Sequence, residues 1–196
     1  MPIILTISCE AHRGAEQQAV RDTWRHLSMG WPFEQKFLLG RNSKEPQWDE
    51  WVLDADDTHA GIQEKVRAAF RRCEEEGLDH AFLCCNDTYI VPCRIQMSGY
   101  RHYDYTGSPC PGGGHARGGD GYWVSPGARY YLAREHLVPG QYADVVNFQT
   151  LLANKIPLHV DTRYGTSITK HLSRGTGNYD PQWMRDLHKH FMEQPL

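Results

Sequence analysis

Apolar residues along the first half of the chain come in short runs separated by amphipathic stretches. Apolar runs of strand length occupy residues 2–9, 33–40, 51–53 and 81–84. Between them, residues 15–27 and 60–76 carry apolar side chains at helical spacing, and Gly77 stands where a helix would end. This alternation of strands and helices predicts an α/β fold with a mainly parallel sheet and helices packed on its faces.

The pattern changes after residue 91. Residues 92–97, 126–136 and 144–155 read as helices, residues 121–125 as a strand, and the glycine-dense stretch 107–121 as a loop facing a ligand. The tail from residue 163 is interrupted by Gly165, Gly175 and Gly177, so we expect no regular element there. No internal repeat or linker is visible, and the sequence therefore predicts one domain over residues 1–196, with a first half at 1–91 and a second at 92–196.

Composition sets outer limits on the function. The 196 residues are 40% hydrophobic, enough for an ordinary core, and 21 basic against 24 acidic residues give a net charge of −3. That balance offers no positive field to recruit nucleic acid or an anionic membrane. The first residues lack a basic segment and are too few for a signal peptide or a membrane span, so we expect a soluble, cytoplasmic protein. The oligomeric state cannot be inferred from the sequence.

The spacing of the cysteines and histidines argues against several other classes of protein. The six cysteines contain no Cys-x-x-Cys pair, which speaks against a zinc knuckle or a thioredoxin-like site and favours reduced, mostly structural thiols. The 11 histidines are scattered, so their spacing does not support a histidine-rich metal hydrolase.

The polar triplet Asn86-Asp87-Thr88 follows the fourth apolar run after one further residue, Cys85. Ligands of open α/β sheets bind just beyond the carboxyl ends of the strands. A carboxylate at that point is well placed to hold a divalent cation against a phosphate. The alternative is an ordinary turn, since Asn and Asp are favoured where strands end.

Six stretches together resemble the β1,3-glycosyltransferases of glycosyltransferase family 31, which include fringe and core-1 galactosyltransferase relatives. They follow the family's order over about residues 13–155, and short matches of this kind carry weight only as a set. They are Arg21-Asp22-Thr23-Trp24, Phe37-Leu38-Leu39-Gly40-Arg41, residues 57–65 (Asp-Thr-His-Ala-Gly-Ile-Gln-Glu-Lys), residues 85–91 (Cys-Asn-Asp-Thr-Tyr-Ile-Val), residues 118–125 (Gly-Gly-Asp-Gly-Tyr-Trp-Val-Ser) and Tyr142-Ala143-Asp144-Val145.

The resemblance implies a GT-A fold in which residues 1–91 form the nucleotide-sugar half and residues 92–196 the acceptor half and C-terminal tail. It implies transfer of a hexose from a UDP-sugar donor to a hydroxyl of a glycan or glycoconjugate acceptor, with inversion at the anomeric carbon. In such an enzyme Mn²⁺ (or Mg²⁺) bridges the diphosphate, and a carboxylate takes the proton of the attacking hydroxyl.

For the metal, the resemblance assigns Asp87, the last acid of the family's Asp-Asp-Asp motif. His171 is the best match to the late histidine of the metal shell, with His159 and His188 as competitors. Cys85 and Asn86 depart from the motif by replacing its first two acids. An amide still offers an oxygen, whereas a thiol suits a hard cation poorly, so the loss of charge puts metal affinity and activity in question.

For the base, the resemblance assigns Asp144, whose other interpretation is the N-cap of the helix that follows. Ala143 replaces the neighbouring acid of the family block, and Asp120 in the glycine block is a second candidate catalytic carboxylate.

Nucleotide contacts are expected from Arg13, Arg21, Asp57 and Lys65, together with Asn86 and Asp87. Arg21 could instead pack structurally beside Trp24, and Asp57 with Lys65 could form a buried pair that ties a loop to its helix. Tyr100, Tyr103, Tyr122 and Trp123 are candidates for an acceptor platform, although core packing is the default interpretation for each ring taken singly.

The sequence therefore predicts a metal-dependent, inverting hexosyltransferase of the β1,3 type. The alternative is a catalytically weak or inactive module that binds nucleotide sugars or glycans, which Cys85 and Asn86 favour. Donor, acceptor and linkage depend on pocket shape and are not readable from these motifs.

Overall fold

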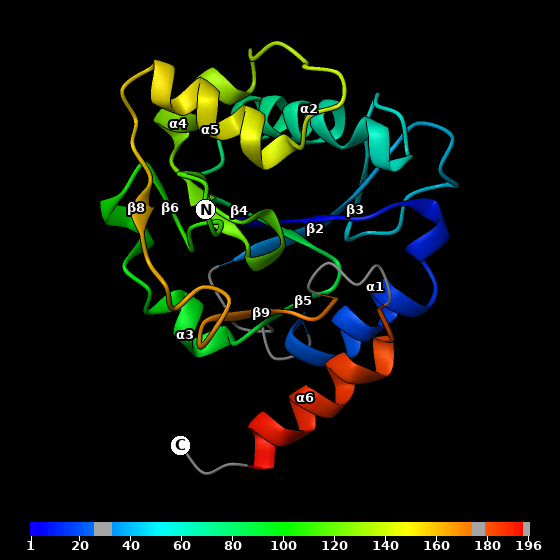
Figure 1. Ribbon diagram of the computed structural model, residues 1–196. Helices are drawn as coiled ribbons and strands as arrows, with labels where there is room; N and C mark the ends of the chain where they lie inside the picture. Colours follow the sequence, from blue (N-terminus) through cyan, green and yellow to red (C-terminus); the bar gives the residue numbers. More distant parts are fainter. Residues whose placement is uncertain (26–32, 174–178, 194–196) are drawn as a thin grey trace.

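A twisted sheet runs through the middle of the computed structural model, which describes residues 1–25, 33–173 and 179–193 (Figure 1). In the described residues the sheet has seven strands in the order β3-β2-β1-β4-β7-β6-β8. The first four along the chain, β1 (Ile3–Ile7), β2 (Glu34–Leu39), β3 (Glu50–Val52) and β4 (Ala81–Cys85), are mutually parallel. These are the four apolar runs of the first half of the chain, so the predicted parallel sheet is confirmed.

The second half of the chain extends the same sheet with short strands. β7 (Tyr122–Val124) pairs antiparallel with both β4 and β6 (Tyr105–Gly107), and β8 (His159–Val160) pairs parallel with β6. Of these three, only β7 was expected from the sequence. The strands of both halves thus form one mixed, mostly parallel sheet.

Helices cover both faces of the sheet (Figure 1). α2 (Ile62–Glu75), α4 (Pro126–Leu132) and α5 (Ala143–Ala153) pack on one face, and α1 (Ala15–Val20) and α6 (Pro181–Glu193) lie on the opposite side. Side chains alternate along β1: Ile3 and Leu5 join the core under α2, and Ile4 joins the core under α1. A strand buried on both faces needs apolar residues at consecutive positions, which explains the unbroken run in the sequence.

The tail is more regular than the sequence predicted. Thr169–His171 forms β9, which pairs antiparallel with β5 (Thr88–Ile90) in a separate two-stranded ribbon, and α6 follows. The expectation of no regular element was wrong because Met184, Leu187 and Phe191 form an apolar stripe that packs against the core under α1. Gly165 lies before β9, while Gly175 and Gly177 fall outside the described residues.

Two other expectations are corrected in detail. The helix expected over residues 15–27 ends as regular α-helix at Val20, and its last residues lie outside the described part of the chain. Three rings of the expected acceptor platform are core residues instead, because Tyr100, Tyr122 and Trp123 are almost fully buried. Only Tyr103 is exposed, and its ring stacks on His159 with centroids 3.5 Å apart.

Helix α3 (Pro92–Gln96) matches the short helix expected after the fourth apolar run, and Gly77 ends α2 in a left-handed conformation as expected. No helix among the described residues is long and apolar enough to cross a membrane.

Gly121 lies where only glycine fits. Its φ is +79°, and a Cβ there would overlap the ring of Phe82 in β4. Gly121→Ala is therefore expected to destabilise the fold by about 3 kcal/mol, adding left-handed strain to core overpacking. Urea unfolding measures this, with Gly112→Ala as the matched control, since Gly112 has φ +75° and an added Cβ would meet nothing within 4 Å. Equal losses in the two variants would show that the contact with Phe82 is not the reason for glycine.

Candidate active site

Asp87 and His171 meet at the carboxyl end of β4. Asp87 lies in the turn between β4 and β5, and the register of the ribbon sets Thr88 opposite His171. As a result, His171 Nε2 lies 3.0 Å from Asp87 Oδ2, and the Ser173 hydroxyl lies 3.1 Å from the same nitrogen. Asp87 can therefore be both a turn residue and a candidate ligand, because its position in the turn brings its carboxylate next to His171. The competing histidines lie elsewhere: His159 is in β8, and His188 is in α6 against the Tyr89 hydroxyl.

The surroundings of Asp87 favour the charged form of its carboxylate. Burial alone would raise the pKa of Asp87, but the hydrogen bond and positive charge of His171 hold the pKa below its usual range. Asp87 is 8% exposed, and among the described residues no other residue donates a hydrogen bond to its Oδ1. A buried carboxylate oxygen without a donor is costly unless a ligand meets it.

The pair fits a divalent cation. Carboxylate oxygen and imidazole nitrogen are both ligands of Mn²⁺, and two ligands held about 2.1 Å from one ion at right angles lie about 3.0 Å apart. The described residues contain no ready cluster of three or more His, Cys, Asp or Glu side chains. The protein therefore offers two side-chain ligands at this point, and a bound diphosphate would supply oxygen ligands of its own.

Cys85 and Asn86, which replace the first two acids of the family's metal motif, behave differently from acids. Burial raises the pKa of the Cys85 thiol well above its usual value, with the charge of Asp87 adding to it, so the thiol stays protonated. Asn86 turns its amide toward helix α1, where Nδ2 donates a hydrogen bond to Glu16 and lies 2.9 Å from Nδ1 of His12.

A turn at Gly118 and Gly119 separates Asp87–His171 from Asp144. The Gly118 amide donates a hydrogen bond of 3.0 Å to Asp144 Oδ2, and a Cβ on Gly119 would overlap the His171 ring. The Gly119 carbonyl accepts a hydrogen bond of 2.7 Å from Thr88, the residue after Asp87. Glycine at both positions lets Asp144 and His171 approach the same turn closely.

Asp144 lies in the first turn of α5 and is not the N-cap of that helix. The helix begins at Ala143, and the capping position is Tyr142, which makes no side-chain cap. The Asp144 carboxylate instead holds the glycine turn, with His115 Nε2 4.0 Å from Oδ2, and its side chain keeps 22% of its surface exposed. The side chain of the second candidate, Asp120, is only 4% exposed and lies 3.5 Å from Arg117. Of the two carboxylates, Asp144 is the more exposed.

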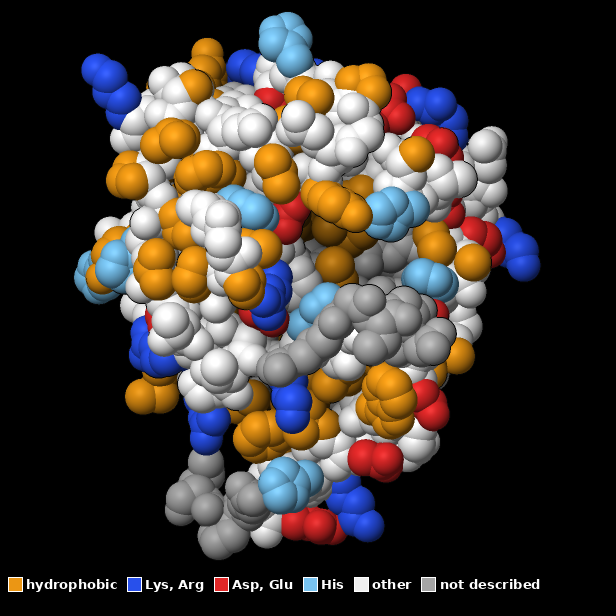
Figure 2. Space-filling view, viewed as in Figure 1, with side chains coloured by type: hydrophobic (Ala, Val, Ile, Leu, Met, Phe, Trp, Pro, Cys, Tyr) orange, Lys and Arg blue, Asp and Glu red, His pale blue; other side chains and the backbone are white. Residues whose placement is uncertain are grey.

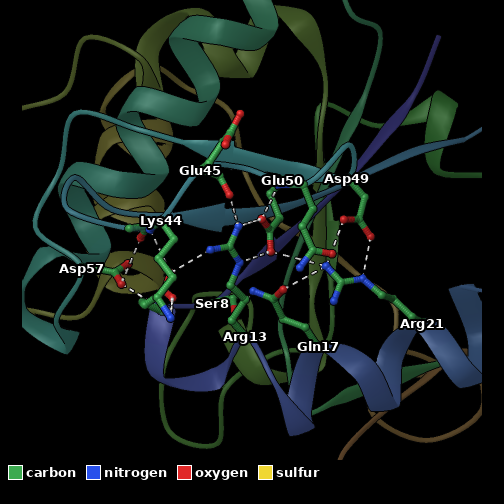
Figure 3. Close-up of polar contacts among 12 residues, drawn as sticks. Ser8, Arg13, Gln17, Arg21, Lys44, Glu45, Asp49, Glu50 and Asp57 are labelled. Atoms are coloured by element: carbon green, nitrogen blue, oxygen red, sulfur yellow. Dashed lines mark hydrogen bonds and ion pairs between the residues drawn. The ribbon is translucent and has the colours of Figure 1, made fainter.

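Arg13 and Arg21 point toward two buried acids (Figure 3). Arg21 makes two bonds of 2.9 Å to Asp49, and its guanidinium lies over the Phe37 ring. Arg13 binds Glu50 at 3.0 and 2.6 Å, and the hydrogen bond to Glu50 raises the pKa of Arg13. Both arginines therefore anchor the start of β3, and a contact with a diphosphate remains a prediction.

Asp57 and Lys65 form a buried pair, which was the structural alternative to a contact with the nucleotide. Lys65 is 1% exposed, and its ammonium donates to Asp57 at 2.8 Å and to the Ser8 carbonyl at 2.6 Å. Asp57 also accepts from the backbone amides of Glu10 and Gly40. One carboxylate thus ties the ends of β1 and β2 to helix α2, and contact with a nucleotide is untested.

Asp57→Asn should make stability less dependent on pH. Partial burial alone would raise the pKa of Asp57, but the Glu10 amide, Lys65 and the Gly40 amide hold it below its usual range. A lowered pKa contributes stability above the unfolded-state value, and that contribution disappears as the pH falls through the folded-state value. We therefore expect the stability gap between wild type and Asp57→Asn to close below about pH 4. Urea unfolding from pH 7 to pH 3 measures the gap, and a constant gap would contradict the prediction.

A cavity of about 920 Å³ opens beside this region, lined by residues 56 and 58–64 at the start of α2 and residues 137–143 before α5. Its wall ends at Ala143, next to Asp144, and the His59 and Tyr142 rings meet edge to face at its side. Figure 2 shows the surface hollowed over the middle of the molecule, with pale-blue histidine side chains around the hollow. The cavity therefore lies beside the start of α5, next to Asp144, and neither Asp87 nor His171 is among its lining residues.

Two residues of the site were missed by sequence reasoning: His12 in η1 (Glu10–His12) and Glu16 in α1. They lie beside Asn86 because β1 and β4 are neighbours in the sheet, so the segments that follow the two strands meet. Motif matching carries no such signal, because the order of strands is not visible in one sequence.

No family model and no curated protein matches the chain. Solved structures do match. One is described as a nucleotide-diphospho-sugar transferase from Desulfovibrio desulfuricans G20, with a TM-score of 0.56, 13% identity and 97% of each chain covered. Another is a glycosyltransferase involved in glycosylation of the major capsid of PBCV-1, with a TM-score of 0.55, 11% identity, and 94% of this chain and 90% of that chain covered. A third is the galactosyltransferase LgtC bound to donor and acceptor sugar analogs, with a TM-score of 0.54, 9% identity, and 100% and 98% covered.

The chain has a GT-A type fold. The three structures span it almost completely, which confirms the predicted fold class for the whole chain. At these identities the likeness shows the fold alone, and it does not single out glycosyltransferase family 31.

Proposed function

We propose that this protein is a glycosyltransferase that moves a hexose from a UDP-sugar to a sugar hydroxyl, in the manner of glycosyltransferase family 31. The observation that carries the proposal is the pairing of Asp87 and His171 with Asp144 across one glycine turn. In a GT-A type fold this arrangement supports a cation-binding role for Asp87 and a role as base for Asp144.

Asp87 and His171 would hold the divalent cation, Mn²⁺ or Mg²⁺. When bound, the cation neutralises the negative charge that builds on the diphosphate as UDP leaves. Asp87 would contribute Oδ1, to which no other described residue donates a hydrogen bond. His171 Nε2, which contacts Asp87 Oδ2 and the Ser173 hydroxyl in this structure, would exchange those contacts for the cation. The turn between β4 and β5 fixes this geometry before the substrate arrives, which reduces the ordering needed on binding.

Asp144 would act as the base. As the acceptor oxygen attacks the anomeric carbon, the hydroxyl proton passes to the carboxylate, the new glycosidic bond forms and the bond from that carbon to the UDP oxygen breaks. Attack from the side opposite UDP inverts the anomeric configuration, with the β1,3 linkage as the family-like outcome. The Gly118 amide donates to Asp144 Oδ2 and the Val145 amide donates to Oδ1, so backbone hydrogen bonds hold both oxygens of the proposed base in place.

A donor screen tests the proposal. The purified protein is incubated with a panel of UDP-hexoses, with Mn²⁺ or with a chelator, and with simple sugar acceptors, and UDP release is measured. We expect release with one donor class, stimulation by an acceptor, and loss of most of the activity in the chelator. The proposal is wrong if the protein neither binds UDP nor releases it from any donor.

A catalytically weak or inactive module that binds nucleotide sugars is the second candidate. Cys85 and Asn86 favour it, because a protonated thiol and an amide replace two acids of the family motif. UDP-sugar binding that depends on Mn²⁺ without any UDP release would identify this alternative.

A further inference from the structure

The cavity between the start of α2 and the segment before α5 is lined by none of the residues assigned to the nucleotide or the cation. Its volume of about 920 Å³ lies in the range of small-molecule sites. Residues 56 and 58–64 form one wall, and residues 137–143 form the other. The second wall ends at Ala143, directly before Asp144, the proposed base. A ligand in the cavity would therefore lie beside that residue.

One buried amide side chain holds the second wall in place. Gln63 Nε2 donates hydrogen bonds to the Val138 carbonyl at 2.8 Å and to the Gln141 carbonyl at 2.5 Å. Gln63 Oε1 accepts a third, of 2.9 Å, from the Val138 amide. These bonds matter because no side chain from residue 136 to residue 142 is buried, so core packing does not fix this segment. A wall that is ordered before the ligand arrives lowers the cost of binding.

Tyr142 presents an aromatic ring on the second wall. It is 68% exposed, and its ring meets the ring of His59, from the first wall, edge to face with centroids 6.2 Å apart. Such a ring is available to a ligand, and the C–H groups of a sugar pack on aromatic faces. Tyr100, Tyr122 and Trp123, the rings first considered for an acceptor platform, are buried in the core. Tyr142 is therefore the better candidate for that role.

The charges of the cavity favour a neutral ligand over a nucleotide. No Lys or Arg is found among its described lining residues, whereas Asp56 and Glu64 both contribute carboxylates. Glu64 forms an ion pair with Arg41 at 3.5 Å, and Asp56 is exposed. Carboxylates repel a diphosphate but accept hydrogen bonds from the hydroxyl groups of a sugar.

We propose that this cavity is the subsite for the acceptor sugar, with Tyr142 as its stacking platform. Gln63 is a positioning residue: it acts on the ligand through the wall that carries Tyr142. The ligand is a neutral sugar unit and not the nucleotide. This rests on the proposed function, because it assigns a place to the acceptor whose hydroxyl Asp144 would deprotonate.

Binding of simple glycosides tests the proposal without an assay of transfer. A panel of neutral methyl glycosides is titrated into the protein in the presence of UDP and Mn²⁺, and saturation-transfer NMR follows their binding. Tyr142→Ala should weaken binding of the best glycoside about tenfold because the stacking face is lost, and Tyr142→Phe should stay within about threefold of wild type. UDP affinity should not change in either variant.

Three further variants separate the platform from a general loss of structure. Tyr130→Ala removes an exposed ring of α4 that does not line the cavity, and it should bind glycosides like wild type. Gln63→Ala should weaken glycoside binding roughly fivefold and leave UDP affinity unchanged, because only the wall loses its hydrogen bonds. In the Tyr142→Ala background the same change should cost little more, since Gln63 acts through the platform.

The outcomes distinguish this proposal from the proposed function. Wild-type glycoside binding in Tyr142→Ala, or no glycoside binding by the wild-type protein, overturns the proposal. A loss of UDP affinity in Tyr142→Ala also overturns it, because the cavity would then hold the nucleotide. If UDP release is stimulated by a glycoside whose KM does not change in Tyr142→Ala, transfer stands and the acceptor binds elsewhere. Glycoside binding that depends on Tyr142, in a protein that neither binds UDP nor releases it, would support the sugar site and reject transfer.

Discussion

Asp87→Ala is expected to remove the Mn²⁺-dependent part of UDP binding, lowering UDP affinity in the presence of Mn²⁺ by on the order of 100-fold. Even residues that only orient a metal ligand cost up to about that much when they are lost, and Asp87 is predicted to be the ligand itself. The buried oxygen Oδ1, left without a donor among the described residues, is the group that the variant deletes. Calorimetric titration of UDP with Mn²⁺ and with a chelator gives the two affinities to compare.

Two controls make the Asp87 experiment specific. Asp87→Asn keeps the size of the side chain and an oxygen near His171 but removes the charge, so it should behave like Asp87→Ala if charge is what matters. Asp186→Ala removes an exposed carboxylate of α6 that contacts Gln182, and it should bind UDP like wild type. An Asp87→Ala protein whose UDP affinity still responds to Mn²⁺ as wild type does would show that the cation is held elsewhere.

The first half of the fold could be predicted because its signals are local. Each parallel strand is buried on both faces, so it appears as an unbroken apolar run, and each flanking helix carries one apolar stripe. The second half depends on pairing between distant residues. β6, β8 and β9 have only two or three residues each, too few for a periodic pattern, and they exist because neighbouring strands accept their hydrogen bonds.

The same distinction applies to the site. Asp87 was found because it follows a strand, and His171 because its surroundings resemble a family motif. The sequence could not show that the ribbon register brings them within 3.0 Å of each other. Glu16 was missed altogether, since its approach to Asn86 follows from the adjacency of β1 and β4. For the aromatic residues the sequence left two interpretations open, and the structure supports core packing for Tyr100, Tyr122 and Trp123.

Asp144→Asn is expected to keep UDP and Mn²⁺ binding within about twofold of wild type and to lower kcat by roughly 10²–10⁴-fold. Asn retains an oxygen that can accept the Gly118 hydrogen bond, so the glycine turn beside His171 should keep its place. What the amide loses is the ability to take a proton, and general-base help in proton transfer is worth this range of rate.

Comparison with Asp120→Asn assigns the base between the two candidates. Asp120 is almost fully buried against Gly165, so its amide variant should disturb folding more than chemistry, with a lower melting temperature and nearly normal turnover per folded molecule. A kcat loss confined to Asp120→Asn would transfer the base to that residue. If both variants turn over UDP-sugar like wild type, neither carboxylate is the base, because a group that accepts the proton in the rate-limiting step cannot be replaced by an amide without cost.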